Sequence, residues 1–139
     1  MFDELIEDLK RDEGWVPTAY NDSLGYITIG YGFLIDPKKD GELPKEIADI
    51  WLEYAVKLRW DQLIKKIPWA NDLPPNVQRA LGNMVFQLGV RGVLNFKRMI
   101  KALKAGDIWL ASIEALDSTW STQTPKRAKR VAKMMRGIK

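Results

Sequence analysis

Apolar residues recur at helical spacing at the start of the chain. They occupy positions i, i+3, i+4 and i+7 and leave an acidic outer face: Phe2, Leu5, Ile6 and Leu9. This spacing predicts an amphipathic helix over residues 1–13, and Gly14 provides the stop that commonly ends a helix. We expect this helix to bury its apolar face against other helices.

The pattern changes after Gly14. Between residues 15 and 35, aromatic and β-branched residues are punctuated by glycines, which predicts a small twisted antiparallel sheet. Residues 21–25 are typical of a first turn, and residues 36–41 form a second cluster of turn-forming residues.

Helical spacing returns after the second turn. A long helix is predicted from about 44 to 66, with Pro44 at its first position. Five residues mark the stripe that we expect this helix to bury: Ile47, Ile50, Trp51, Tyr54 and Leu58. A further helix follows Pro74 and Pro75, and its stripe has the same periodicity: Val77, Leu81, Met84 and Leu88.

Three shorter helices complete the predicted elements, near residues 92–105, 107–117 and 125–136. Gly106 separates the first two, and a loop around Trp120 precedes the third. Thr124 and Pro125 are typical of an N-cap followed by a first-turn proline.

These elements predict an α+β, mostly helical fold over residues 1–139, which is the size of one domain. We expect a bilobed domain, with a cleft between the lobes as the default ligand site. Its parts are a small lobe over about 12–45, a connecting helix over about 44–66, and an all-helical lobe over about 67–139 packed with helix 1–13.

The chain contains neither Cys nor His. The absence of Cys excludes disulfides, thiolate catalysis and cysteine metal sites. The absence of His removes the usual general base and the commonest transition-metal ligand. Proton chemistry must therefore use Asp, Glu, Lys or Tyr, and we expect no metal.

Charge is distributed unevenly around a net charge of +4. Residues 1–14 contain six acids, whereas residues 120–139 contain seven bases and no acid. A basic segment of this kind can bind nucleic acid, anionic lipid or a charged wall polymer, but a solvated helix face is the more common outcome. We favour the solvated face and expect no nucleic acid partner.

No stretch approaches the roughly 20 apolar residues that a spanning helix needs. The acidic, amphipathic start is also unlike a secretory signal peptide. We therefore expect no membrane span and synthesis in the cytoplasm.

Glu13 is the first candidate catalytic residue. On a helical wheel it lies about 20° from Phe2, inside the apolar stripe at the last turn of the predicted helix. Burial and the helix C-terminus both favour the protonated carboxyl that a general acid needs. The alternative is a helix-terminal Glu that reaches water or pairs with a structural Arg.

Asp22, in the predicted first turn, is the second candidate. One carboxyl in an apolar setting and one in a polar setting suit glycosidic cleavage, in which the first protonates the leaving oxygen and the second directs water or stabilises the cationic transition state. Thr28 lies on the second predicted strand, where its hydroxyl is available to that water. Taken alone, each is an ordinary turn Asp or strand Thr.

Three blocks of residues, in order along the chain, resemble the phage-type lysozymes of glycoside hydrolase family 24. They are Asp12-Glu13-Gly14 with Tyr20-Asn21-Asp22 and residues 25–32, then residues 83–89, and then Trp120 with residues 123–131. The resemblance spans nearly the whole chain and implies a lysozyme-like fold.

The resemblance implies a reaction. Glu13 takes the proton-donor position, Asp22 the second carboxylate, and Thr28 the position that helps place the attacking water. Such enzymes hydrolyse the β-1,4 bond between N-acetylmuramic acid and N-acetylglucosamine with inversion and need no cofactor.

Five more positions match family residues with other roles. Arg127 matches an arginine that pairs with the acidic Glu. Gln87 and Trp120 match residues that brace the interlobe region, and Leu34 and Phe86 fall where the family contacts sugar. The chain departs from the family at Met99 and Glu114, whose positions elsewhere are polar sugar contacts.

The implied partner is peptidoglycan, and we expect a monomer. The enzyme would remain in the host cytoplasm until a separate membrane-permeabilising partner, such as a holin, releases it to the wall. Two alternatives stay open. One is a lytic transglycosylase on the same substrate, and the other is a non-catalytic protein of this fold that binds wall polymer or nucleic acid.

Overall fold

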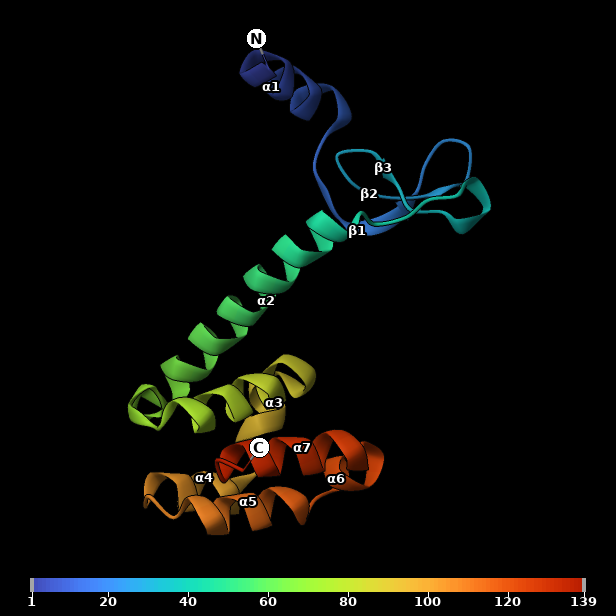
Figure 1. The fold of residues 1–139 in the computed structure, drawn as a ribbon. Helices are drawn as coiled ribbons and strands as arrows, with labels where there is room; N and C mark the ends of the chain where they lie inside the picture. Colours follow the sequence, from blue (N-terminus) through green and yellow to red (C-terminus); the bar gives the residue numbers. More distant parts are fainter. Residues whose placement is uncertain (1, 139) are drawn as a thin grey trace. The chain divides into compact units, whose positions relative to one another are not determined.

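The computed structural model describes residues 2–138. It divides into two compact units: the N-terminal unit, Met1–Ile50, and the helical unit, Trp51–Lys139. The boundary falls within one long helix, α2 (Lys45–Lys66), which runs from the first unit into the second (Figure 1).

The N-terminal unit contains the predicted helix and the predicted sheet. The sheet is antiparallel, in the order β1-β2-β3. The elements are α1 (Phe2–Glu13), β1 (Val16–Asn21), β2 (Ile27–Gly30), β3 (Phe33–Leu34) and the 3-10 helix η1 (Pro37–Lys39).

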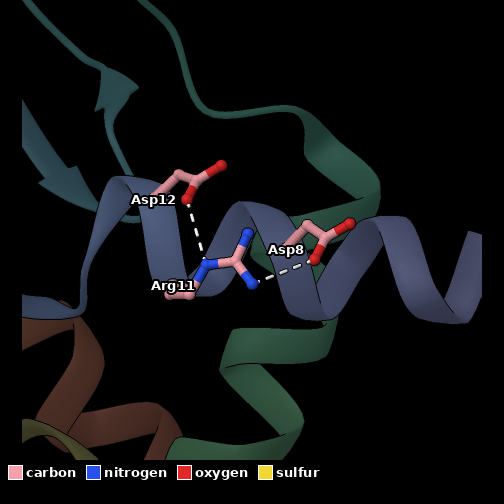
Figure 2. A network of polar contacts seen from close by, with 3 residues as sticks. All are labelled: Asp8, Arg11 and Asp12. Carbon is pink, nitrogen blue, oxygen red and sulfur yellow. Dashed lines mark hydrogen bonds and ion pairs between the residues drawn. The ribbon is translucent and has the colours of Figure 1, made fainter.

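Helix α1 ends where the sequence predicts. Gly14 has a φ of 73° and donates its N–H to the Lys10 carbonyl, a left-handed C-terminal stop. The outer face is charged, and Arg11 lies between the carboxylates of Asp8 and Asp12, 3.2 Å from each (Figure 2). Nothing within the N-terminal unit covers the apolar stripe, since no residue of α1 is buried and Phe2 is 68% exposed. The expected packing of α1 with the helical lobe is a contact between the two units and stays a prediction.

Asp36 orders the segment that leads out of the sheet. It is buried, and its two carboxylate oxygens accept the N–H groups of Ile27 and Lys38 at 3.1 and 2.8 Å. The hydrogen bond from Ile27 and then that from Lys38 lower the pKa of Asp36 below its ordinary value of 3.8, against the opposing effect of burial. This single side chain therefore links β2 to η1.

The helical unit is built from the rest of α2 and from the later helices. These are η2 (Pro68–Asp72), α3 (Pro75–Leu94), α4 (Lys97–Lys104), α5 (Ile108–Leu116), α6 (Thr119–Gln123) and α7 (Pro125–Met135). None of the described helices is long and apolar enough to cross a membrane.

Apolar side chains from these helices form one core. The predicted stripe of α3 is confirmed, because Val77, Leu81 and Met84 are fully buried and Leu88 packs against the core while partly buried. Helices α4, α5 and α7 add apolar side chains, and Leu63 is the buried residue of α2.

The expected buried stripe of α2 is wrong. All five of its residues are exposed: Ile47, Ile50, Trp51, Tyr54 and Leu58. An apolar stripe is buried only where another element covers it, and α2 contacts the core chiefly through its last turns. The helix also begins one residue later than expected, at Lys45, with the Pro44 carbonyl accepting the N–H groups of Ile47 and Ala48.

Several boundaries after residue 88 differ from the sequence expectation. Gly89 has φ 74° and ψ 171°, which breaks α3, and its second part continues to Leu94. A short helix, α6, replaces the predicted loop around Trp120. Thr124 does not cap α7 with its side chain, because its hydroxyl donates to the Trp120 carbonyl at 3.1 Å. The predicted fold class, a small sheet followed by a long helix and a helical region, is confirmed.

Candidate active site

Asp22 closes the turn between β1 and β2. Its Oδ1 accepts the N–H groups of Leu24 and Tyr26, both at 2.9 Å, and its own N–H donates to the Tyr26 carbonyl at 2.8 Å. One oxygen of the carboxylate thus fixes the turn. No described residue donates to Oδ2, which leaves that oxygen available to water or substrate.

Thr28 is held by the Tyr26 carbonyl, which also accepts the N–H of Asp22. Its side chain is buried on β2, and its hydroxyl donates to the Tyr26 carbonyl at 3.0 Å. Because a hydroxyl has a single hydrogen, Thr28 keeps only its lone pairs for another partner. Asp22 and Thr28 are therefore brought together through the main chain of Tyr26, and both can accept hydrogen bonds from a water.

Leu34 lies beside Thr28 on the sheet. The two residues are paired across β2 and β3. Leu34 is 38% exposed, so part of its side chain remains available to a ligand. The structure thus brings three of the predicted site residues, Asp22, Thr28 and Leu34, onto one sheet and its first turn.

Glu13 is the last residue of α1, and its carboxylate lies against the turn between β2 and β3. A Cβ added to Gly32 would lie 2.6 Å from Glu13 Oε2, so the absence of a side chain at Gly32 gives the carboxylate its space. Within the N-terminal unit Glu13 is exposed, and its expected burial, which depends on the helical lobe, stays a prediction. Its apolar neighbours on α1 are exposed as well, so the stripe does not enclose it.

Gln87 and Trp120 contact each other within the helical unit, while their expected role in bracing the interlobe region stays a prediction. The indole Nε1 of Trp120 donates to Gln87 Oε1 at 2.9 Å, which satisfies the only polar group of a side chain that is 4% exposed. Phe96 packs edge-on against the same indole. This contact joins α3 to α6 within the helical unit.

Arg127 and Phe86 line one hollow of the helical unit, about 470 Å³ in volume. The Nε of Arg127 donates to Asn83 Oδ1 at 2.9 Å, which anchors α7 on α3. Phe86 is 40% exposed on the wall of the hollow. The pairing of Arg127 with Glu13 would join the two units and stays a prediction.

A second hollow of the helical unit, about 600 Å³ in volume, is lined by two positions at which the chain departs from polar sugar contacts of the family. Met99 and Glu114 line it together with Trp120 and Lys97. The hollow therefore combines an aromatic edge with side chains of both charges.

Sequence reasoning missed three groups that position these side chains. Asn83 opens the second matching block, yet its role as the acceptor for Arg127 has no periodic signal. Asp36 precedes a proline at a helix start, a pattern typical of a capping Asp, and this pattern could have identified it. The Tyr26 contribution comes from its main chain, which no residue type reveals. Within residues 2–138, no three acidic side chains gather in a way that could hold a metal ion.

Comparison with known proteins decides the family. The model of the phage lysozyme family matches residues 10–136. The chain belongs to the phage lysozyme family. It is therefore a glycoside hydrolase whose substrate class is peptidoglycan.

Relatives of the chain differ in how much of their own length the match covers. "Probable T4-type lysozyme 2" of Dictyostelium discoideum is 34% identical over 157 residues, covering 94% of this chain and 92% of that protein. "Probable T4-type lysozyme 1" of the same organism is 30% identical, with the same coverage. The "Pre-baseplate central spike protein Gp5" of Enterobacteria phage T4 is 36% identical, but the match covers 91% of this chain and only 26% of that protein.

Proposed function

We propose that the enzyme is an inverting endo-β-1,4-N-acetylmuramidase that cleaves peptidoglycan between N-acetylmuramic acid and N-acetylglucosamine. The proposal assigns Glu13 as general acid, Asp22 as general base and Thr28 as the residue that orients water. The observation that carries it is the main chain of Tyr26, whose N–H donates to Asp22 and whose carbonyl accepts from Thr28, leaving each side chain a free acceptor.

The proposed step balances as a single displacement. Glu13 gives its proton to the glycosidic oxygen, which departs with the electron pair of the breaking C1–O bond. The oxygen of a water forms the new bond to C1, and the free Oδ2 of Asp22 takes the proton that this water loses. Thr28 can only accept from the water, because its hydrogen is donated to the Tyr26 carbonyl. The lone pair of the water is then left free for attack.

Inversion requires room for this water between the two carboxyl groups. Glu13 lies against the turn after β2, whereas Asp22 lies in the turn before it. The four residues of β2 span about 10 Å. Placement at opposite ends of this strand favours the wider carboxyl separation of inverting enzymes, roughly 6.5–9.5 Å, over the roughly 5–5.5 Å of retaining ones.

Digestion of purified peptidoglycan by the parent and by Glu13→Gln tests the proposal. We expect the parent to release muropeptides with reducing muramic acid ends, detected by mass spectrometry, and the variant to lose roughly 10²–10⁴-fold in rate. The anomeric form of the first product, followed by NMR, reports inversion. Anhydro-muramic ends would instead establish a lytic transglycosylase, and unchanged cleavage by Glu13→Gln would remove Glu13 from the mechanism.

We also propose that the enzyme acts in host-cell lysis, is active as a monomer, and reaches the wall from the host cytoplasm after a separate holin-like partner opens the membrane. The absence of a helix able to span a membrane among the described residues is compatible with a separate partner. Cells that produce the enzyme should remain intact until a pore-forming agent is added and should then lyse. Lysis without such an agent would contradict the need for a partner.

A further inference from the structure

The two units carry charges of opposite sign. The N-terminal unit has twelve acids and five bases, a net charge of −7, whereas the helical unit has six acids and seventeen bases, a net charge of +11. All four ion pairs found within residues 2–138 lie in the N-terminal unit. The described basic side chains of the helical unit are thus not paired with carboxylates of that unit.

Four of these cations form one face of α7. They are spaced i, i+3, i+4 and i+7 and all are exposed: Lys126, Lys129, Arg130 and Lys133. The opposite side of the helix carries the buried residues Ala128, Val131, Ala132 and Met135. We call the four cations the α7 basic face. Seven residues of helical rise place its charges within about 10 Å along the helix axis.

One end of the α7 basic face borders a hollow of about 430 Å³. Arg130 and Lys133 line it from α7, and Arg79 lines it from α3. The amide nitrogen of Asn76 joins the two helices there by donating to the carbonyls of Met134 and Met135. No acidic side chain lines the hollow. Two arginines and one lysine, from two helices, thus line one concave surface.

We propose that the α7 basic face and this hollow bind a linear phosphodiester polymer of the bacterial wall, at a site separate from the cleavage chemistry. Guanidinium groups bind the paired oxygens of such anions bidentately. Several cations within about 10 Å match a ligand whose negative charges follow one another closely. The stem peptides of peptidoglycan are attached at least a disaccharide apart along the glycan, so their clustered carboxylates match a continuous row of cations less well.

The choice of a wall polymer rests on the proposed function, because an enzyme that cleaves peptidoglycan works among such polymers. The charge of the helical unit then draws that unit toward the wall. The N-terminal unit, with a net charge of −7, contributes no attraction of its own.

Cosedimentation with walls tests the proposal. The probe is bacterial wall that carries glycerol-phosphate polymer, compared with the same wall after hydrofluoric acid has removed the polymer. All proteins carry Glu13→Gln so that the wall stays intact. The test variant has Lys126→Gln, Lys129→Gln, Arg130→Gln and Lys133→Gln. The matched control loses four exposed lysines elsewhere in the helical unit: Lys57, Lys65, Lys66 and Lys101.

We expect the parent and the control to bind the untreated wall strongly and the treated wall weakly. Loss of four phosphate contacts should flatten the slope of log K against log salt by about 3. Between about 50 and 200 mM salt, parent binding should therefore weaken roughly fifty-fold more than binding by the test variant. Circular dichroism establishes that the three proteins are equally folded.

Three results would overturn the proposal. Equal binding to treated and untreated wall would assign the affinity to peptidoglycan itself. Equal loss in the test variant and the matched control would show a general effect of net charge. Tighter binding to duplex DNA than to the untreated wall would identify a nucleic acid surface. A failure of the proposed function can be told apart from these results. It would appear as the absence of reducing muramic acid ends when the protein without the Glu13→Gln substitution digests treated wall.

Discussion

Among residues 2–138, nineteen apolar residues are buried in the helical unit, whereas the buried residues of the N-terminal unit are Thr28, Gly30 and Asp36. The first set is shielded by packing among helices. In the second set, Thr28 and Asp36 are held by hydrogen bonds to the main chain of the sheet and its turns. The residues proposed to carry out proton transfer belong to the unit with the polar interior.

Because of this difference, we expect the two units to respond differently to acid and to substitutions. Apolar packing resists unfolding through buried area, which is insensitive to pH but sensitive to lost volume. Hydrogen bonds to the main chain are directional, so they fix the orientation of Asp22 and Thr28, and those made by Asp36 depend on its charge.

Leu63→Ala should have the largest effect on stability. Leu63 is fully buried and connects α2 to the core, so we expect a loss of about 2–5 kcal/mol in the free energy of unfolding. Hydrogen exchange should show the loss in peptides from the helical unit. The control Leu58→Ala, at an exposed position of the same helix, should change the free energy by about 0.5 kcal/mol or less. Equal losses would contradict the assigned core.

Gly32→Ala should come next, and it tests the site directly. Gly32 has a φ of 73°, and the left-handed conformation costs a residue with a Cβ about 1–2 kcal/mol. The new Cβ would also displace the Glu13 carboxylate, so cleavage of peptidoglycan should fall more than stability does.

The matched control is Gly106→Ala. Gly106 has a similar φ of 80° in the helical unit, with no other atom near the added Cβ. Its loss of stability should be similar, while the rate of cleavage by the folded enzyme stays unchanged. A parallel loss of cleavage in both variants would refute a specific contact between Gly32 and Glu13.

Acid should weaken the N-terminal unit in particular. The pKa of Asp36 is lowered in the folded state, so the folded protein binds this proton less readily than the unfolded chain. Its contribution to stability is present above the ordinary carboxyl pKa of 3.8 and is lost as the pH falls through the lower folded value.

Urea unfolding at several pH values, monitored by hydrogen exchange of residues 16–36, checks this pH dependence. Asp36→Asn should destabilise the sheet at neutral pH, because one main-chain N–H then faces an amide NH₂, and it should remove part of the loss seen in acid. The exposed neighbour Asp40 offers the control Asp40→Asn, which should keep the acid sensitivity of the parent. A parent sheet that is equally stable at pH 3 and pH 7 would contradict the role of Asp36.

Thr28→Val should have the smallest effect on stability and a clear one on activity. The Tyr26 carbonyl keeps its hydrogen bond from the Asp22 N–H, so removal of the hydroxyl should cost less than about 1 kcal/mol. The rate of cleavage should fall because the water loses an acceptor. Thr28→Ser should restore most of that rate, and failure to do so would reduce Thr28 to a packing role.

Hydrophobic periodicity correctly predicted the buried face of a helix where that face packs within its own unit. The α3 stripe through Val77, Leu81 and Met84 is one example. The same reasoning misjudged the stripe of α2, because spacing shows that a face is apolar and not whether another element covers it. The packing of α1 with the helical lobe stays a prediction. The break between α3 and α4, at residues 95 and 96, was missed because the predicted helix near 92–105 runs across it.

The sequence predicted the residues of the candidate site better than it predicted their exposure and contacts. Spacing and resemblance led to Glu13, Asp22 and Thr28, and the structure connects the last two. The exposure of Glu13 within the N-terminal unit could not be read from its position on the wheel, since burial depends on what packs over that face. The contact with Gly32 could not be predicted either, because it joins residues nineteen positions apart.

The link between Asp22 and Thr28 belongs to the peptide backbone of position 26, while the Tyr26 ring contacts Lys39 instead. Evolution can therefore exchange the side chain at this position and keep the link, so the position should vary among functional homologues. Alanine scanning would overlook it for the same reason. An amide-to-ester replacement at the Tyr26 nitrogen, introduced by chemical synthesis, would remove the N–H that donates to Asp22 and so break the link.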